Sequence, residues 1–258
     1  MAELVPADSR HVVAVADHVG NLRNGIRNID VLADHLRAAS EVIGSIPRGE
    51  LIVTVGGDCG IELAPIEAAI SRSKGRMAVV WLDAHADLNN SMTSPSGAFH
   101  GMVLRTLMGD GPSELRTSEV LAPNQVILAG ARALDVGEQA FVETHQIPRL
   151  RVADMADPRG LVDAVRGTGA DSVYLHLDFD VLDPTVFTAV GSPEPSGLGL
   201  DELLAAVQAL LAEFRLAGVG LTEYEPSSGD LCHDDILRRI VAGIFDSDSQ
   251  RADRKVEC

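Results

Sequence analysis

Six short apolar runs, separated by amphipathic segments, constrain the fold of this 258-residue chain more than any other feature. The runs are rich in branched side chains, as is typical of strands buried on both faces of a parallel sheet. Their alternation with helical patterns predicts βαβ units. The expected strands are residues 51–55, 77–82, 125–129, 149–153, 172–177 and 218–222. The expected helices are residues 61–73, 100–108, 136–145, 158–166, 200–215 and 234–245.

Composition narrows the classes of partner. The net charge of −17 and an aromatic content of 3% disfavour nucleic acid and anionic membranes, which require basic or stacking surfaces. No apolar segment is long enough to span a bilayer and no signal-peptide pattern is present, so a cytoplasmic protein is expected. Three cysteines argue against a disulfide framework. Because no linker-like stretch divides the chain, residues 1–258 are expected to form a single domain.

Polar motifs follow five of the six apolar runs. In open parallel sheets, ligands bind at the carboxyl ends of the strands, so these motifs are expected to meet along one rim. The motifs are Gly56-Gly57-Asp58-Cys59, Asp83-Ala84-His85-Ala86-Asp87, Gly130-Ala131-Arg132, Asp178-Phe179-Asp180 and Glu223.

Two of these motifs are typical of metal ligands. Asp83, His85 and Asp87 alternate, so an extended backbone directs all three side chains to one side. Asp178 and Asp180 repeat the pattern almost a hundred residues later. Carboxylates can bridge two cations, and this donor set suits Mn²⁺, with Zn²⁺, Co²⁺ and Fe²⁺ as competitors. The pattern predicts a site for two metal ions and hydrolysis by metal-activated water.

The combined motifs resemble those of the ureohydrolases, which include arginase and agmatinase. The order Gly-Gly-Asp-x, Asp-Ala-His-x-Asp and Asp-x-Asp-x-x-Asp-Pro carries the resemblance, which extends over residues 51–245. It implies a three-layer α/β/α sandwich around a mostly parallel sheet, with two Mn²⁺ per subunit. It also implies a homo-oligomer, either a trimer or a pair of trimers.

The resemblance also implies roles for individual residues. One cation would be held by Cys59, Asp83, Asp87 and Asp178. The other would be held by His85 and Asp180, with Asp83 and Asp178 shared. A water activated by both cations would attack the guanidinium carbon and release urea and a free amine.

Catalytic roles fall on His100, Asp180 and Glu223 by the same resemblance. His100 matches a histidine that shuttles protons to the leaving amine, a role suited to the pKa of imidazole. Glu223 matches the carboxylate that pairs with the substrate guanidinium through charge-assisted hydrogen bonds.

Four further positions match contacts to the amino-acid end of arginine. Asn89 and Ser96 match residues that bind the α-carboxylate, and Asp135 matches the residue that binds the α-amine. Ser192 stands where threonine is usual and keeps the hydroxyl. Together they favour hydrolysis of L-arginine to L-ornithine and urea. The alternatives are agmatinase, guanidinobutyrase or N-hydroxyarginine hydrolase activity, or a catalytically silent protein that binds a guanidino ligand.

The chain departs from the family pattern at several positions. Cys59 replaces the usual histidine ligand, which leaves open a Cys-ligated metal pair, a single-metal site, a weak enzyme, or a small buried residue and a lost cation. His176 replaces a small polar residue; a core histidine is favoured, with a supporting or surrogate ligand as the alternative. Glu194 adds an acid near the expected pocket mouth and either favours a more cationic substrate or faces water. In residues 1–24 the usual first strand is missing; either residues 11–16 form a remnant strand or the segment is shortened.

Overall fold

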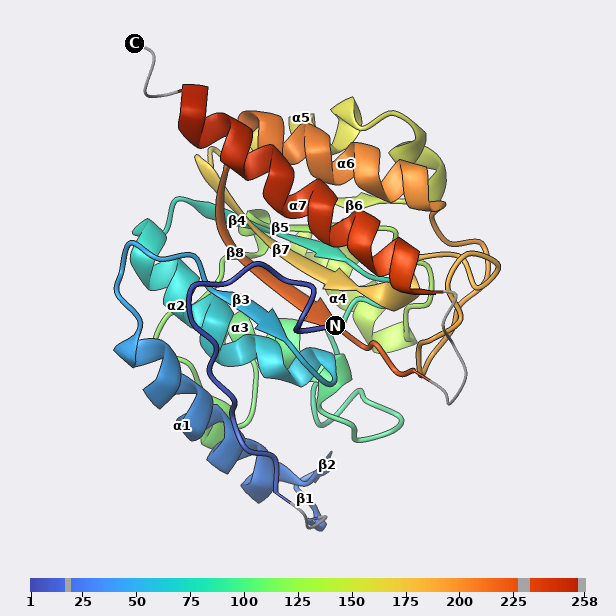
Figure 1. Ribbon diagram of the computed structural model, residues 1–258. Helices are drawn as coiled ribbons and strands as arrows, with labels where there is room; N and C mark the ends of the chain where they lie inside the picture. The colour runs from blue at the N-terminus through green and yellow to red at the C-terminus, as the bar shows by residue number, and fades with distance from the viewer. Residues whose placement is uncertain (17–19, 227–232, 255–258) are drawn as a thin grey trace.

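The computed structural model describes residues 1–16, 20–226 and 233–254, with side chains described as far as residue 245. A central sheet lies between two helical layers (Figure 1), which confirms the expected α/β/α architecture. All pairings in the six-stranded sheet are parallel, and the strand order is β3-β8-β7-β4-β5-β6. The strands are β3 (Val53–Val55), β4 (Met77–Leu82), β5 (Val126–Ala129), β6 (Arg149–Leu150), β7 (Ser172–Asp178) and β8 (Arg215–Thr222).

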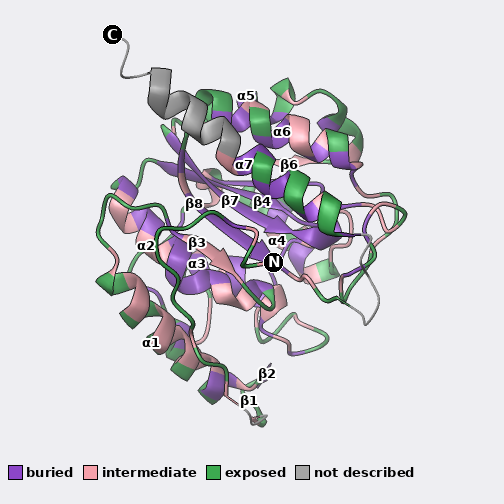
Figure 2. Ribbon diagram, viewed as in Figure 1, coloured by how far each residue is buried: buried purple, intermediate pink, exposed green. Residues whose placement is uncertain are grey.

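Each face of the sheet buries one set of helices. Alternation along β4 directs Val79 and Trp81 into one apolar cluster and Val80 and Leu82 into the other. The first cluster is covered by α1 (Ile29–Ser45), α2 (Leu63–Ser73), α3 (Val103–Leu107) and α4 (Val136–His145). The second is covered by α5 (Arg159–Gly167), α6 (Leu200–Glu213) and α7 (Asp234–Arg254). Strands β4, β5 and β7 are buried along their whole length and the edge strands β3 and β6 are half-buried, whereas the helices expose their outer faces (Figure 2).

The strand order places a topological switch point between β4 and β7. From β4 the chain continues outward to β5 and β6, whereas from β7 it continues in the opposite direction to β8. At such a point the connections leave in opposite directions and open a crevice at the carboxyl ends of the strands. The two aspartate-rich motifs follow these two adjacent strands, so the fold brings them together.

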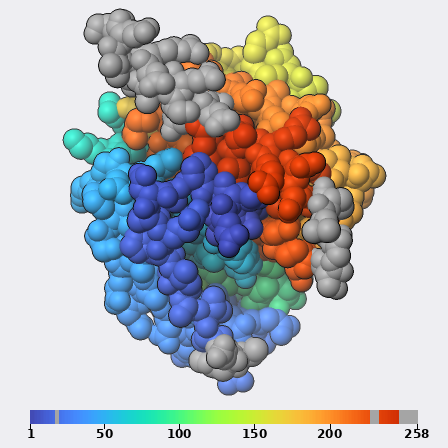
Figure 3. Space-filling model, viewed as in Figure 1, coloured from blue at the N-terminus to red at the C-terminus, as the bar shows by residue number. Residues whose placement is uncertain are grey.

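The N-terminal quarter differs from the sequence-based expectation. Helix α1 was not predicted, although Ile29, Leu32, Leu36 and Ile43 recur along it at helical spacing. Residues 11–16 form no strand, so the expectation of a remnant strand there is wrong. Val5 is nevertheless buried in the core, and the first residues lie across the molecule beside α7 (Figure 3). Cys232 and Cys258 lie outside the described residues.

A small hairpin supports one of the loops at the rim. Strands β1 (Leu22–Arg23) and β2 (Ile26–Arg27) are joined by Asn24 and Gly25, both with positive φ, as a tight two-residue hairpin turn requires. Arg27 donates from its backbone N to Gly97 O and from Nε to Ser96 O, each at 2.8 Å. The hairpin therefore fixes the loop that carries Ser96. Among the described residues, no helix is both long and apolar enough to cross a membrane.

Candidate metal centre

Asp83 is fixed at the end of β4 through both of its carboxylate oxygens. Oδ2 accepts from Trp81 Nε1 at 2.9 Å, and Oδ1 accepts from the backbone N of His85 at 2.6 Å. Burial works against ionisation, but hydrogen bonds from His176 and His85 hold the pKa of Asp83 well below its usual range. A buried carboxylate that stays ionised is suited to bind a cation.

The end of β7 is tied to the end of β4. Asp178 Oδ1 accepts from the backbone N of Asp180 at 2.7 Å, which turns the chain so that both carboxylates face the rim. Asp180 Oδ1 accepts from Ala84 N at 3.0 Å, across from the β4 loop. Burial, followed by the neighbouring charges of Asp83 and Asp180, raises the pKa of Asp178 well above its ordinary value.

Cys59 lies against the β7 carboxylate, at the start of a short 3₁₀ helix (Cys59–Glu62) after β3. Its thiol donates to Asp178 Oδ2 at 3.2 Å and lies 3.6 Å from Thr222 Oγ1. Burial, with further contributions from Asp87 and Asp178, raises the pKa of the Cys59 thiol well above its ordinary value. In the absence of a cation, Cys59 is therefore a protonated, buried thiol.

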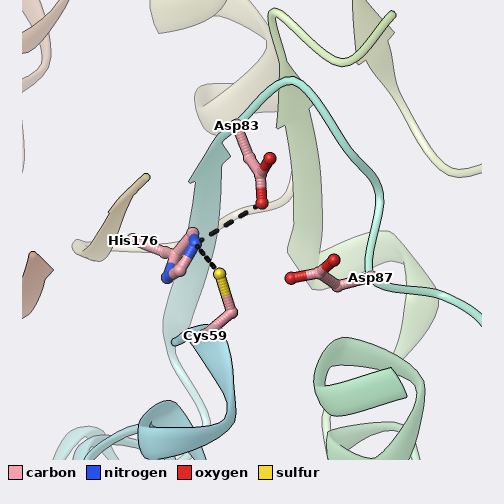
Figure 4. Close-up of side chains that lie close together, drawn as sticks. All are labelled: Cys59, Asp83, Asp87 and His176. Atoms are coloured by element: carbon pink, nitrogen blue, oxygen red, sulfur yellow. Dashed lines mark hydrogen bonds and ion pairs between the residues drawn. The ribbon is translucent and has the colours of Figure 1, made fainter. Parts of the chain in front are cut away.

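The predicted ligands converge in three groups in which the ligand atoms lie within 4.8 Å of one another. All six expected ligands belong to these groups, and His176 and Glu223 join them. The groups are Cys59, Asp83, Asp87 and His176; Cys59, Asp178 and Glu223; and Asp83, His85 and Asp180. Figure 4 shows the first group, in which the four side chains point toward one another.

The donor set fits divalent cations. Asp87 Oδ2 is buried and has no hydrogen-bond partner within the described part of the chain. Burial, followed by the charge of Asp83, raises the pKa of Asp87 well above its ordinary value. Burial disfavours protonation of His85, but hydrogen bonds to Asp180 and Asp83 outweigh it and raise the pKa of His85 to about 11. Burial and mutual repulsion thus make the ionised carboxylates of this site unfavourable. A divalent cation would supply the positive charge that stabilises them.

A histidine–glutamate pair lies at the rim. His100 Nδ1 is 3.4 Å from Glu223 Oε1, and the two side chains come from different loops. The hydrogen bond to Glu223 raises the pKa of His100, although partial burial opposes the shift. Glu223 has a φ of 61°, an uncommon conformation for a residue with a side chain, and it ends β8 with its backbone N bonded to Gly57 O. The pair can hold or transfer a proton beside the cluster of candidate ligands.

The residues expected at the amino-acid end of a substrate are distributed over three loops. Asn89 Nδ2 donates to Asp135 Oδ2 at 2.8 Å, so these two residues are brought together. Ser96 lies in the loop held by the hairpin, and Ser192 is exposed in the loop after β7. Glu194, in the same loop, has its Oε1 4.0 Å from His85 Nε2 and therefore faces the cluster.

His176 is fully buried beneath the cluster. Burial opposes its protonation, but contacts with Asp83 and Glu62 raise its pKa. Its ring stacks on Trp81 with centroids 3.4 Å apart and an interplanar angle of 10°. Glu62 Oε2 is 3.5 Å from His176 Nδ1 on the side away from the cluster.

Sequence reasoning missed several residues that support the site. Glu62 is buried although it is charged, and the only sequence signal was an acid placed directly before an apolar helix. Glu138 accepts from Leu88 N at 2.9 Å and so fixes the loop after Asp87. Arg132 was expected at the rim, but not its contacts: its guanidinium donates to the carbonyl oxygens of Asp180 and Glu194, each at 2.8 Å. These contacts depend on tertiary structure and leave little trace in sequence spacing.

Known proteins resemble this chain in sequence and in fold. The profile of the arginase family matches residues 6–233. The arginase of Staphylococcus aureus (strain COL) is 35% identical over 214 residues, which cover 79% of this chain and 70% of that protein.

Solved structures agree. Entamoeba histolytica arginase in complex with L-ornithine matches with a TM-score of 0.82 at 26% identity, covering 90% of this chain and 83% of that one. Bacillus caldovelox arginase has the same fold, with a TM-score of 0.81 at 24% identity and coverage of 90% and 83%. These matches agree with the two aspartate motifs at the β4–β7 switch point. This chain therefore belongs to the arginase family.

Proposed function

We propose that this arginase-family hydrolase converts L-arginine to L-ornithine and urea at a centre of two divalent cations. The observation that carries the proposal is the convergence of a buried thiol, a histidine and four aspartates at the ends of neighbouring strands. Such a donor set is costly to bury without cations. L-Ornithine, which the Entamoeba histolytica relative binds in its solved structure, would be the amine product.

Cys59, Asp83, Asp87 and Asp178 would hold one cation. His85 and Asp180 would hold the other, with Asp83 and Asp178 shared. When bound, such a pair supplies Lewis acidity and lowers the pKa of the attacking water. The family resemblance implies Mn²⁺, and Zn²⁺, Co²⁺ or Fe²⁺ are the alternatives, above all at the position where Cys59 supplies a softer donor.

The rim residues would bind the substrate and move its protons. The Glu223 carboxylate would pair with the guanidinium and hold its carbon over the cluster. His100, 3.4 Å from Glu223, would deliver a proton to the leaving amine. At the far end of the substrate, Asn89, Ser96 and Ser192 would bind the α-carboxylate side, and Asp135 the α-amine.

Glu194 supports a second candidate. Its carboxylate faces His85 at 4.0 Å and would repel an α-carboxylate while favouring a substrate with an additional positive charge. Agmatine fits that description, since it keeps the guanidinium and carries an amine without a carboxylate. The two candidates differ only in the non-reacting end of the substrate.

A substrate panel tests both candidates. Protein loaded separately with Mn²⁺, Zn²⁺, Co²⁺ and Fe²⁺ is incubated with L-arginine, agmatine, 4-guanidinobutyrate and N-hydroxyarginine, and urea or hydroxyurea is measured. L-Arginine should give the highest kcat/KM. No release from any compound with any metal would overturn the proposal, and less than one bound equivalent of metal would instead favour a silent binding protein. The trimeric or hexameric assembly remains a separate prediction.

Substitution of the guanidinium partner should reduce turnover sharply. Glu223→Gln removes the charge that would pair with the substrate, and hydrogen bonds to charged groups account for about 1.5–3 kcal/mol. We therefore expect kcat/KM for L-arginine to fall on the order of 10- to 100-fold. Glu225→Gln is the matched control, because Glu225 is exposed two residues away, and it should leave kcat/KM unchanged. Equal effects of the two variants would exclude this role for Glu223.

Cation binding should release protons and tighten as the pH rises. His85 has a pKa raised to about 11 without a cation, and the pKa values of Cys59 and Asp87 are also raised, so a cation must displace protons that these groups hold at neutral pH. Raising the pH lowers that cost. Calorimetric titration with Zn²⁺ in buffers of different ionisation enthalpy measures the number released. An affinity that does not change between about pH 6 and pH 8 would contradict this expectation.

A further inference from the structure

We propose that His176 Nε2 is a ligand of the first cation, so that this position is built from a thiolate, an imidazole and carboxylates and takes Zn²⁺ or Fe²⁺ in preference to Mn²⁺. The inference rests on the two-cation centre of the proposed function. Cys59 stands where the family usually has a histidine ligand. In this chain His176 supplies the imidazole from β7 instead, because it lies two residues before Asp178 and so faces the same cluster. Thiolate and imidazole donors suit the softer metals.

The distances suit a shared cation. His176 Nε2 lies 3.6 Å from Cys59 Sγ and 3.7 Å from Asp83 Oδ2. With a Zn–S bond of about 2.3 Å and a Zn–N bond of about 2.1 Å, the sulfur and nitrogen on one tetrahedral ion lie roughly 3.6 Å apart. Asp87 completes the group, and its buried Oδ2 has no other partner in the described chain. Figure 4 shows all four side chains turned toward the same point.

The ring is held in the orientation that a ligand needs. Trp81 lies beside His176 in the β4–β7 register and stacks on it in parallel. Glu62 Oε2 faces Nδ1 at 3.5 Å from the opposite side. Metal-binding histidines commonly direct their second nitrogen to a carboxylate, which keeps the proton there and leaves the other lone pair for the metal. Here that arrangement leaves Nε2 free to bind the cation.

The strand next to β7 makes room for this carboxylate. Gly220 pairs with His176 in the register, and a Cβ at Gly220 would overlap the Glu62 carboxylate. The absence of a side chain on β8 at this position therefore allows a buried acid behind the histidine. An ordinary apolar core would need neither the acid nor the glycine.

A satisfied core histidine would show different contacts. Buried polar groups normally have hydrogen-bond partners. Nδ1 of His176 faces the Glu62 carboxylate at 3.5 Å, a charge contact that falls short of strict hydrogen-bond geometry within the described part of the chain. Nε2 has two close partners, Cys59 Sγ at 3.6 Å and Asp83 Oδ2 at 3.7 Å, and both are candidate ligands of the same cation. The ring is thus positioned by stacking and charge, with its best acceptor nitrogen directed at the ligand cluster.

Nitrogen-15 NMR of the histidine rings tests the inference on the wild-type protein, with Zn²⁺ as the only added ligand. We expect the Nε2 resonance of His176 to shift on zinc binding while the ring proton stays on Nδ1. His176→Asn identifies the signal. In this variant the asparagine amide can donate to Glu62 from about the place that Nδ1 occupies in the wild type, and no nitrogen replaces Nε2. His176 signals that are identical with and without zinc would overturn the inference.

Chelator competition gives a second readout. His176→Asn should weaken one of the two zinc affinities by more than about 100-fold, and Glu62→Gln should weaken the same one by about 10- to 100-fold. His145→Asn changes an exposed histidine on α4 and should alter neither affinity. A folded His176→Asn protein, by near-ultraviolet circular dichroism, with both affinities intact would also overturn the inference.

These measurements do not depend on turnover. If zinc binds as expected and no guanidino compound is hydrolysed, the proposed function fails while the His176 ligand stands. If urea is released and the His176 resonances do not shift on addition of zinc, the ligand assignment fails while the proposed function stands.

Discussion

Asp178→Asn is expected to abolish urea release and at the same time to stabilise the metal-free protein. Asp178 is the proposed ligand shared by both cations, so turnover should fall well beyond the roughly 100-fold that the loss of an outer partner costs. The amide keeps an oxygen for Asp180 N and can donate to the Cys59 sulfur, so the fold has no steric reason to change. Metal analysis, urea release and thermal unfolding after chelation measure the three effects.

The stability gain should depend on pH in a defined direction. The pKa of Asp178 is raised in the folded protein by burial and by Asp83 and Asp180, so folding disfavours its ionised form. The wild-type penalty is absent below the unfolded-state pKa of about 3.9 and grows as the pH rises toward the folded-state value. Each kcal/mol recovered by the amide raises Tm by roughly 2–4 °C for a chain of this size.

Asp8→Asn is the matched control, since Asp8 is exposed in the N-terminal segment. It should leave urea release, metal content and Tm unchanged. Saturating Zn²⁺ should reverse the order of stability, because a ligand that binds only the folded wild type stabilises it. A metal-free Asp178→Asn protein that unfolds below the wild type at neutral pH would contradict the expected relief of charge repulsion.

Gly220→Ala should destabilise the protein by about 1–3 kcal/mol, the usual cost of an added methyl group in a packed core. The new Cβ would overlap the carboxylate of Glu62, which is fully buried and would have to move. The displaced carboxylate must move toward His176 or into apolar surroundings, and both moves are unfavourable. Denaturant unfolding gives the change in free energy, and chelator competition reports whether the cation site is also weakened.

Gly44→Ala provides the opposite case. Gly44 lies in α1, and a Cβ there would meet nothing within 4 Å. Alanine favours the helix over glycine, so this variant should gain about 0.5–1 kcal/mol. Equal free energies of unfolding for the two alanine variants would show that the space beside Glu62 is not as confined as the structure indicates.

The sheet and most of its helices were predictable from the sequence. The apolar runs predicted the boundaries of β4, β5 and β7 to within one residue, because these strands are buried along their whole length. Residues 149–153 were too long a strand, since the chain leaves the sheet after Leu150 and enters a 3₁₀ turn. Helix α1 was not predicted although its apolar residues recur at helical spacing, and only Ile29 and Val31 along it are fully buried.

The meeting of the candidate ligands was predictable because polar residues that follow neighbouring parallel strands lie along one edge of the sheet. The expected alternation does not continue past the strands. β4 ends at Leu82, Asp87 has a φ of 53° and Asp180 lies in a 3₁₀ turn, so the turns after β4 and β7 direct these side chains. The position of His176 against Cys59 needed more. Two residues 117 positions apart meet there, with Glu62 behind them, because β8 pairs with both β3 and β7 and so brings the end of β3 close to His176.

The switch point between β4 and β7 has a consequence for when the centre is completed. Asp83, His85 and Asp87 leave the ribosome long before β7 is synthesised, because β5, β6 and three helices lie between the two strands in the sequence. Until β7 docks beside β4, the nascent chain lacks Asp178 and Asp180, and Asp178 is the proposed shared ligand. The complete centre can therefore bind its cations only late in folding. Bound metal would then stabilise the contact between the ligands that follow β4 and those that follow β7.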